Sequence, residues 1–255
     1  MSAEYPILEF DDSRDAIIEP SKMLKPVDGM PEHCVMPIYD QVIKALKKTD
    51  LLTHIDDIRT SMGPMPVYRM TYEGKDVAVA HPGLGAPLAA AVFEALIAFG
   101  CRKFMACGAA GVLDSALAKD TVVVPSGAVR DEGTSYHYLT PGREIAVEPE
   151  VVKSLQTVLE SRGVKYQIGK TWTTDAIFRE TKKRIMKRRS EGCLTVEMEC
   201  AAFLAVAAFR GVRFGQLLAA GDDVSGSEWD PRQMKERRSF PEQLFWLSVE
   251  ACMKF

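Results

Sequence analysis

The sequence lacks most of the features that mark membrane and secreted proteins. No stretch approaches the ~18 consecutive apolar residues that a membrane helix needs, so no membrane association is predicted. The start of the chain has acidic residues and no apolar core flanked by positive charge, unlike a signal peptide. The 6 cysteines are scattered without a CxxC pair, which predicts buried thiols and no disulfide framework. These absences favour a cytoplasmic protein.

Positive charge and metal ligands are also scarce. The formal net charge is −3, which gives no global field for binding nucleic acid. The one concentrated basic run, residues 182–189, is interpreted as the solvated face of a helix, with a nucleic-acid patch as the alternative. With 4 histidines and no ligand set of usable spacing, no metal is expected.

Short β-rich runs alternate with longer amphipathic stretches from Cys34 onward. This pattern predicts an α/β domain over residues 31–255, with a central mixed sheet between layers of helices and ligands at the carboxyl ends of the strands. Residues 1–30 are predicted to form an irregular arm in which Pro20 and Pro26 break any helix. Strands are predicted at residues 67–72, 76–80, 103–107, 121–124, 166–172, 195–196 and 214–220, and helices at 40–48, 87–99, 149–162, 181–191, 198–210 and 240–253.

Two glycine-rich segments follow predicted strands. Residues 81–87 (HPGLGAP) precede a predicted helix, and glycines there would let backbone N–H groups approach an anion at the helix N-terminus. The alternative interpretation of the same residues is a plain tight turn. The segment is not GxGxxG, which argues against a dinucleotide site. Residues 106–113 (ACGAAGVL) are predicted to form a second loop, after which Asp120 precedes an apolar strand.

This second segment and the strand after it resemble the superfamily that contains uridine phosphorylase, hexameric purine nucleoside phosphorylase and methylthioadenosine nucleosidase. Residues 196–202 (VEMECAA) are similar to the E-M-E signature of that superfamily. The resemblance implies a three-layer α/β/α sandwich of the phosphorylase type. It also implies ribose binding by Glu197, Met198 and Glu199, with Glu199 accepting hydrogen bonds from the sugar hydroxyls. The alternative is an ordinary helix start with acidic first-turn residues.

The resemblance also assigns residues to the base. Asp222, at the end of an apolar strand, is similar to the residue that protonates purine N7, and Asp223 in that role, or both as helix caps, stays open. Thr174 and Phe178 resemble the end of the base-pocket strand, and Phe178 is predicted to stack on the base. His137 lies in a stretch similar to a uridine phosphorylase segment and is a predicted wall of the ribose pocket.

The resemblance is weaker at the phosphate site. The positions of two arginines that phosphorylases commonly carry hold Gln41 and Ala106 here. Arg59 resembles an arginine that reaches the phosphate of an adjacent subunit, and Gly108 and Ala109 are predicted to complete the anion site.

Three functions therefore remain open at this point. The leading prediction is a phosphorylase that uses phosphate as co-substrate, needs no cofactor and gives free base and ribose 1-phosphate. A purine is favoured because residues 179–183 lack the Gln-x-Arg pair with which pyrimidine-specific members read uracil. The alternatives are a nucleosidase, with Asp40 or Glu32 activating water, and an inactive nucleoside-binding protein. A homo-oligomer, dimer or hexamer, is implied because sites in this superfamily are completed across a dimer face.

Overall fold

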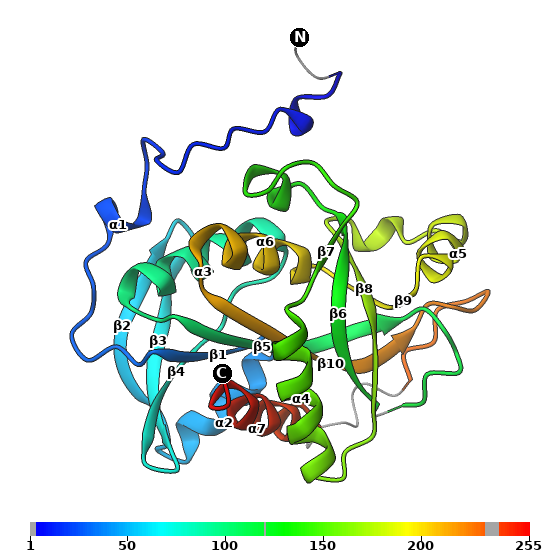
Figure 1. Cartoon of the computed structure of the whole chain (residues 1–255). Coiled ribbons are helices and arrows are strands. Elements are labelled where there is room, and N and C mark those ends of the chain that lie inside the picture. Colours follow the sequence, from blue (N-terminus) through cyan, green and yellow to red (C-terminus); the bar gives the residue numbers. More distant parts are fainter. Residues whose placement is uncertain (1–3, 120, 233–239) are drawn as a thin grey trace.

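The computed structural model describes residues 4–119, 121–232 and 240–255. Within these residues, ten strands form one mixed sheet, and helices pack on both of its faces (Figure 1). Helices α3 and α6 lie on one side, and α2, α4 and α7 lie on the other. The predicted α/β fold with a central mixed sheet is therefore confirmed. No helix of the described residues has the length and apolar character needed to cross a membrane.

The strands are β1 (His33–Pro37), β2 (Thr53–Thr60), β3 (Gly63–Tyr72), β4 (Lys75–Ala80), β5 (Lys103–Val112), β6 (Val122–Asp131), β7 (Glu144–Ala146), β8 (Tyr166–Thr174), β9 (Cys193–Glu197) and β10 (Arg213–Asp223). The helices are α1 (Pro20–Met23), α2 (Asp40–Lys48), α3 (Ala86–Phe99), α4 (Pro149–Ser161), α5 (Lys182–Ser190), α6 (Cys200–Arg210) and α7 (Phe240–Cys252). Three short 3-10 helices are η1 (Pro6–Leu8), η2 (Thr134–His137) and η3 (Ile177–Arg179).

Four strands at the centre of the sheet run parallel and end at one edge. Strand β1 pairs in parallel with β4 and β5, and β5 pairs in parallel with β10. These strands are buried on both faces, as their apolar sequences require. The segments that follow them meet at the same side of the sheet, which we call the carboxyl edge.

Five strands also close into a ring. From β5 the pairing runs to β10, β6, β8 and β9 and returns to β5. The closing pair is antiparallel and joins Gly111 to Val196 and Val112 to Thr195. The end of β9 is thereby held against the last residues of β5, at the carboxyl edge.

Strand β5 corrects the prediction of a glycine-rich loop after Cys107, because the strand continues to Val112. The small residues allow neighbouring elements to approach it closely. A Cβ on Gly111 would lie 2.9 Å from Val196 Cγ1, and one on Gly108 would lie 3.3 Å from the Ile38 side chain. Glycine at position 111 therefore allows the ring to close, and glycine at position 108 leaves room for Ile38. Asp120 lies outside the described residues.

Strands β1, β2 and β7 were not predicted. Strand β2 is rich in polar and charged residues and lies at the edge of the sheet, where half of its residues are exposed. The six predicted helices are all present. Helix α2 has the predicted bounds, whereas α6 begins at Cys200 and not at Met198, because residues 198 and 199 form a bend after β9. Edge-to-face contacts of the Phe93 ring with Phe104 and Phe203, at 4.4 and 5.5 Å between centroids, anchor α3 between β5 and α6.

The arm lies against the body of the domain. Contrary to the prediction, Pro20 does not prevent a helix but occupies the first turn of α1, where its missing N–H is no loss. The buried carboxylate of Glu19 accepts a hydrogen bond from the Ala16 N–H (2.7 Å) and pairs with Arg210 (3.2 Å). The Arg14 guanidinium lies 4.7 Å from the centre of the Phe209 ring. These contacts attach the arm to the end of α6.

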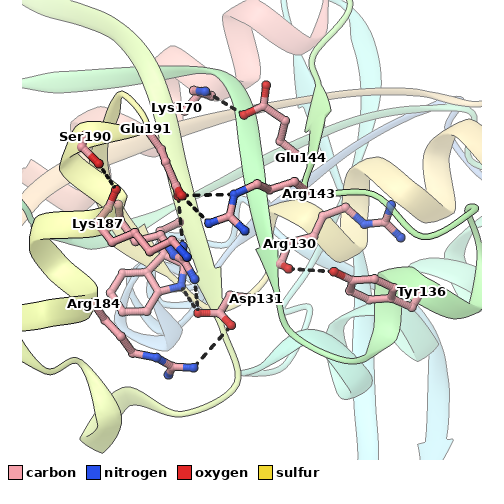
Figure 2. Close-up of polar contacts among 12 residues, drawn as sticks. Arg130, Asp131, Tyr136, Arg143, Glu144, Lys170, Arg184, Lys187, Ser190 and Glu191 are labelled. Carbon is pink, nitrogen blue, oxygen red and sulfur yellow. Dashed lines mark hydrogen bonds and ion pairs between the residues drawn. The ribbon is translucent and has the colours of Figure 1, made fainter. Parts of the chain in front are cut away.

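The basic run forms α5, and several of its charges are paired with carboxylates (Figure 2). The Arg188 side chain is 9% exposed and donates hydrogen bonds to Asp131 (2.9 Å) and Glu191 (3.0 Å). Asp131 also accepts from Trp172 Nε1 (2.8 Å), and Arg184 lies 3.5 Å from the same carboxylate. This network fixes α5 to the ends of β6 and β8.

We predict that Arg188→Ala lowers the free energy of unfolding by about 2–4 kcal/mol, because it leaves a partly buried Asp131 without its main cation. Arg189→Ala is the matched control. Its pair with Asp114 has side chains 43% and 42% exposed, so the expected loss is about 0–1 kcal/mol. Urea denaturation measures both variants. Equal losses would contradict the role given to the buried network.

Candidate active site

Glu197 ends β9 and organises the start of α6. Its carboxylate accepts hydrogen bonds from the Thr173 hydroxyl (2.6 Å) and from the N–H groups of Glu199 (2.8 Å) and Cys200 (2.6 Å). The Thr173 hydroxyl in turn accepts from the Ala201 N–H (3.0 Å). Three N–H groups at the helix start, which have no partner within the helix, are satisfied in this way. Both oxygens of Glu197 are thus engaged within the chain, and its predicted contact with ribose stays a prediction.

Glu199 links two segments that are far apart in the sequence. Its side chain is buried, and Oε1 accepts a hydrogen bond from the Gly85 N–H (2.6 Å). Gly85 precedes α3 with a φ of 83°, a conformation that favours glycine. The contact joins the segment after β4 to the start of α6. The Met198 N–H also bonds to this carboxylate, and lone pairs remain for further donors, such as sugar hydroxyls.

The neighbouring carboxyl groups of Glu197 and Glu199 both have raised pKa values. Burial and the adjacent Glu199 charge raise the pKa of Glu197, and its three hydrogen-bond donors offset only part of this rise. Burial likewise raises the pKa of Glu199, against the opposing effect of the Gly85 N–H. Met198 lies half-buried between them. Paired carboxyl groups with raised pKa values are typical of functional sites.

The structure distinguishes the two aspartates at the end of β10. The carboxylate of Asp223 pairs with Arg232 (2.5 Å) and accepts the Ser225 N–H (2.8 Å). Burial raises its pKa, but these donors outweigh burial and lower it overall. Asp222 is half-buried and accepts one hydrogen bond, from Trp229 Nε1 (2.7 Å). Asp223 therefore stabilises the loop, whereas Asp222 keeps an oxygen available at the carboxyl edge.

Asp222 lies beside the ring closure. A Cβ on Gly111 would lie 3.9 Å from Asp222 Oδ1, so glycine at this position leaves room for the carboxylate. Gly111 pairs with Val196, the residue before Glu197. The predicted acid and the Glu197–Glu199 turn are therefore brought to the same part of the carboxyl edge by β5.

Sequence reasoning missed Glu180, which follows η3. Burial, and secondarily the charge of Asp222, raise the pKa of this carboxyl group to about 7. The two groups therefore lie within electrostatic reach of each other. The motif pattern could not have found Glu180, because a single glutamate in a polar segment is usually a solvated surface residue.

The residues predicted to contact the base have different environments. Thr174 is buried at the end of β8, and its hydroxyl accepts a hydrogen bond from the Ala176 N–H (3.2 Å). Phe178 projects from η3 with 96% of its surface exposed. Its stacking on a base stays a prediction.

Two other predicted residues lie on a separate cavity of about 1140 Å³ between the arm and the body. Arg59, near the end of β2, and His137, in η2, are exposed side chains that line it. The cavity borders the first turn of α3, whose N-terminus also carries the Gly85 contact with Glu199. Gly108 is buried in β5 and Ala109 is exposed, and the structure does not bring either close to Arg59 through any contact it describes.

The two candidate water-activating carboxylates lie at opposite edges of the sheet. Glu32 precedes β1 and pairs with Lys103 at 3.2 Å. Asp40 follows β1, at the carboxyl edge, and forms an ion pair with Lys44. Burial lowers the pKa of His81, which follows β4, and the charge of Asp40 offsets part of that shift. Position favours Asp40. Among the residues that the structure describes, no group of three His, Cys, Asp or Glu side chains is arranged to hold a metal ion.

Comparison with known proteins agrees with this geometry. Residues 34–240 match the model of the phosphorylase superfamily, and the chain belongs to that family. The chain is similar to a guanosine phosphorylase of Halorubrum lacusprofundi, with 27% identity over 64% of this chain and 68% of that protein. It is also similar to a purine nucleoside phosphorylase, DeoD-type 1, of Shewanella oneidensis, with 24% identity over 79% of this chain and 86% of that protein.

Solved structures show the same fold. An AMP nucleosidase of Bacteroides thetaiotaomicron aligns with a TM-score of 0.70 at 21% identity, covering 88% of this chain and 89% of the other. A purine nucleoside phosphorylase of Toxoplasma gondii aligns with a TM-score of 0.74 at 18% identity, covering 88% and 91%. The predicted phosphorylase-type fold and family membership are thus confirmed.

We predict that Glu180→Gln stabilises the chain at pH 8 and has little effect at pH 5. Because the pKa rises from 4.5 to about 7 on folding, the folded chain binds this proton more tightly, and wild-type stability falls as the pH rises through that window. Solvent screening limits the effect to about 1 kcal/mol, or about 2–4 °C in Tm. Thermal unfolding of Glu180→Gln and of the exposed control Glu228→Gln measures it. A gain that is the same at both pH values would contradict the raised pKa.

Proposed function

We propose that this chain cleaves the N-glycosidic bond of a purine nucleoside, with phosphorolysis to free base and ribose 1-phosphate as the leading reaction. The observation that carries the proposal is the convergence of an anchored Glu199 and an available Asp222 at the carboxyl edge. The similarity of much of the chain to a guanosine phosphorylase and a purine nucleoside phosphorylase supports the same substrate class.

Each carboxyl group has a distinct role in the proposed reaction. Glu199 accepts hydrogen bonds from the ribose hydroxyls, while its Oε1 also accepts the hydrogen bond from the Gly85 N–H. Asp222 gives a proton to N7 of the base, so the base leaves as a neutral molecule while positive charge develops on the sugar. Phe178 stacks on the base, and Met198 packs against the sugar. Glu197 holds the turn in place.

The nucleophile distinguishes the two candidate reactions. In phosphorolysis, Arg59, Gly108 and Ala109 contribute to an anion site, with Arg59 supplied by a second copy of the chain. A dimer or hexamer is the expected assembly. Hydrolysis by water is the second candidate, and the position of Asp40 after β1, at the carboxyl edge, favours it. Neither reaction requires a cofactor.

The direct test is base release from guanosine, inosine, adenosine and uridine, each with and without phosphate. We expect release from at least one purine nucleoside that depends on phosphate, and little release from uridine. Equal release without phosphate would show hydrolysis, and Asp40 would then be tested as the residue that activates water. Saturable binding without any release would instead support an inactive nucleoside-binding protein and contradict the proposal.

Two variants separate the roles at the site. Asp222→Asn keeps the side-chain size but removes the proton donor, so kcat for purine nucleosides should fall roughly 100-fold or more with little change in KM. Glu199→Gln weakens charge-assisted bonds to ribose and should lower kcat and raise KM together. Steady-state kinetics measure both, and Glu228→Gln controls for a lost surface charge. Unchanged kinetics in either variant would remove that residue from the site.

A further inference from the structure

Trp229 donates a hydrogen bond to Asp222, the proposed acid. Its indole Nε1 lies 2.7 Å from Asp222 Oδ2, although 62% of the Trp229 surface is exposed. An aromatic ring with this exposure gains little free energy from packing, because most of its apolar surface still contacts water. The indole N–H is the single polar group of the side chain, and the fold uses it to bond the proposed acid.

The loop that carries Trp229 is held closed by its own residues. Asp223 and Asp230 form an antiparallel bridge, in which the Asp223 N–H donates to the Asp230 carbonyl (2.8 Å) and the Asp230 N–H donates to the Asp223 carbonyl (3.0 Å). Arg232 pairs with the Asp223 carboxylate (2.5 Å) and donates to the Leu117 carbonyl (2.9 Å). Because Trp229 immediately precedes Asp230, the bridge holds it next to the end of β10.

The bond from Trp229 makes the two oxygens of Asp222 different. Oδ2 accepts the indole N–H, whereas Oδ1 lies on the side of Gly111, where a Cβ would be 3.9 Å away. Oδ1 accepts no hydrogen bond from the residues that the structure describes. An indole N–H only donates, so the oxygen that receives it must act as an acceptor. In a neutral carboxyl group the carbonyl oxygen is the better acceptor, and the proton therefore stays on Oδ1.

We propose that Trp229 is a positioning residue that keeps the Asp222 proton on Oδ1, facing N7 of the bound purine. This inference rests on the proposed function. The Oδ1 proton passes to N7 as the glycosidic bond breaks, the electron pair of that bond passes to the base, and the base leaves neutral. Asp222 becomes a carboxylate, and the same indole N–H stabilises its charge. The attacking phosphate or water loses a proton when its bond to the sugar forms, and Asp222 takes up a proton from solvent.

A substrate that needs no proton separates this role from a structural one. In 7-methylguanosine, N7 already carries a methyl group and the ring a positive charge. Trp229→Phe removes the N–H donor and keeps an aromatic ring. We expect this variant to lower kcat for guanosine roughly 10-fold at neutral pH, with KM within about twofold of wild type. Both parameters for 7-methylguanosine should stay within about twofold of wild type.

Two further variants test whether the effect depends on the hydrogen bond. Trp229→His should recover part of the loss on guanosine, because Nε2 of an imidazole occupies the same ring position as the indole Nε1. In an Asp222→Asn background, Trp229→Phe should change kcat for guanosine by less than about twofold, because Trp229 acts through Asp222. Glu228→Gln, which changes an exposed neighbour in the same loop, should match wild type on both nucleosides.

Equal losses on both nucleosides in Trp229→Phe would show a structural role and overturn the inference. A full additional loss in the Asp222→Asn background would also overturn it, since Trp229 would then act independently of the acid. A wild-type chain that releases no base from either nucleoside would overturn the proposed function and this inference with it. Wild-type release from guanosine that does not depend on Trp229 would overturn the inference alone.

Discussion

The burial of two neighbouring carboxyl groups at the start of α6 is the constraint on which the site depends. An unpaired carboxylate in this environment is strongly destabilising, so each one must find donors within the fold. Glu197 takes them from Thr173 and the first turn of the helix, and Glu199 takes one from Gly85. These bonds tie β8, β9, α6 and the segment before α3 into one rigid unit.

The closed ring of strands holds the start of α6 at the carboxyl edge. Antiparallel pairing of β9 with the end of β5 brings Glu197 to the carboxyl edge, and parallel pairing of β5 with β10 brings Asp222 there as well. Gly111 is the shared point, because a side chain on it would collide with Val196. The position of the proposed acid Asp222 relative to the proposed sugar-binding carboxylate Glu199 is therefore set by backbone pairing.

Local patterns predicted much of this fold. The amphipathic period of α2 predicted its bounds, and the E-M-E signature predicted a helix start within two residues of the first residue of α6. The extension of β5 through Gly111 was not predictable, because glycine indicates a turn unless the packing partner is known. The choice between Asp222 and Asp223 also needed the structure, since only the position of Arg232 shows which carboxylate is already paired. The raised pKa of Glu180 comes from burial and from the charge of Asp222, a residue distant in sequence.

The arrangement of sugar and base at the carboxyl edge is the central claim. A crystal structure with a purine C-nucleoside, which has no cleavable N-glycosidic bond, together with phosphate would test it most directly. The account predicts ribose hydroxyls within hydrogen-bonding distance of Glu199 and the N7 edge of the base facing Asp222. A nucleoside bound in the cavity beneath the arm, with Glu199 and Asp222 free of ligand, would contradict it.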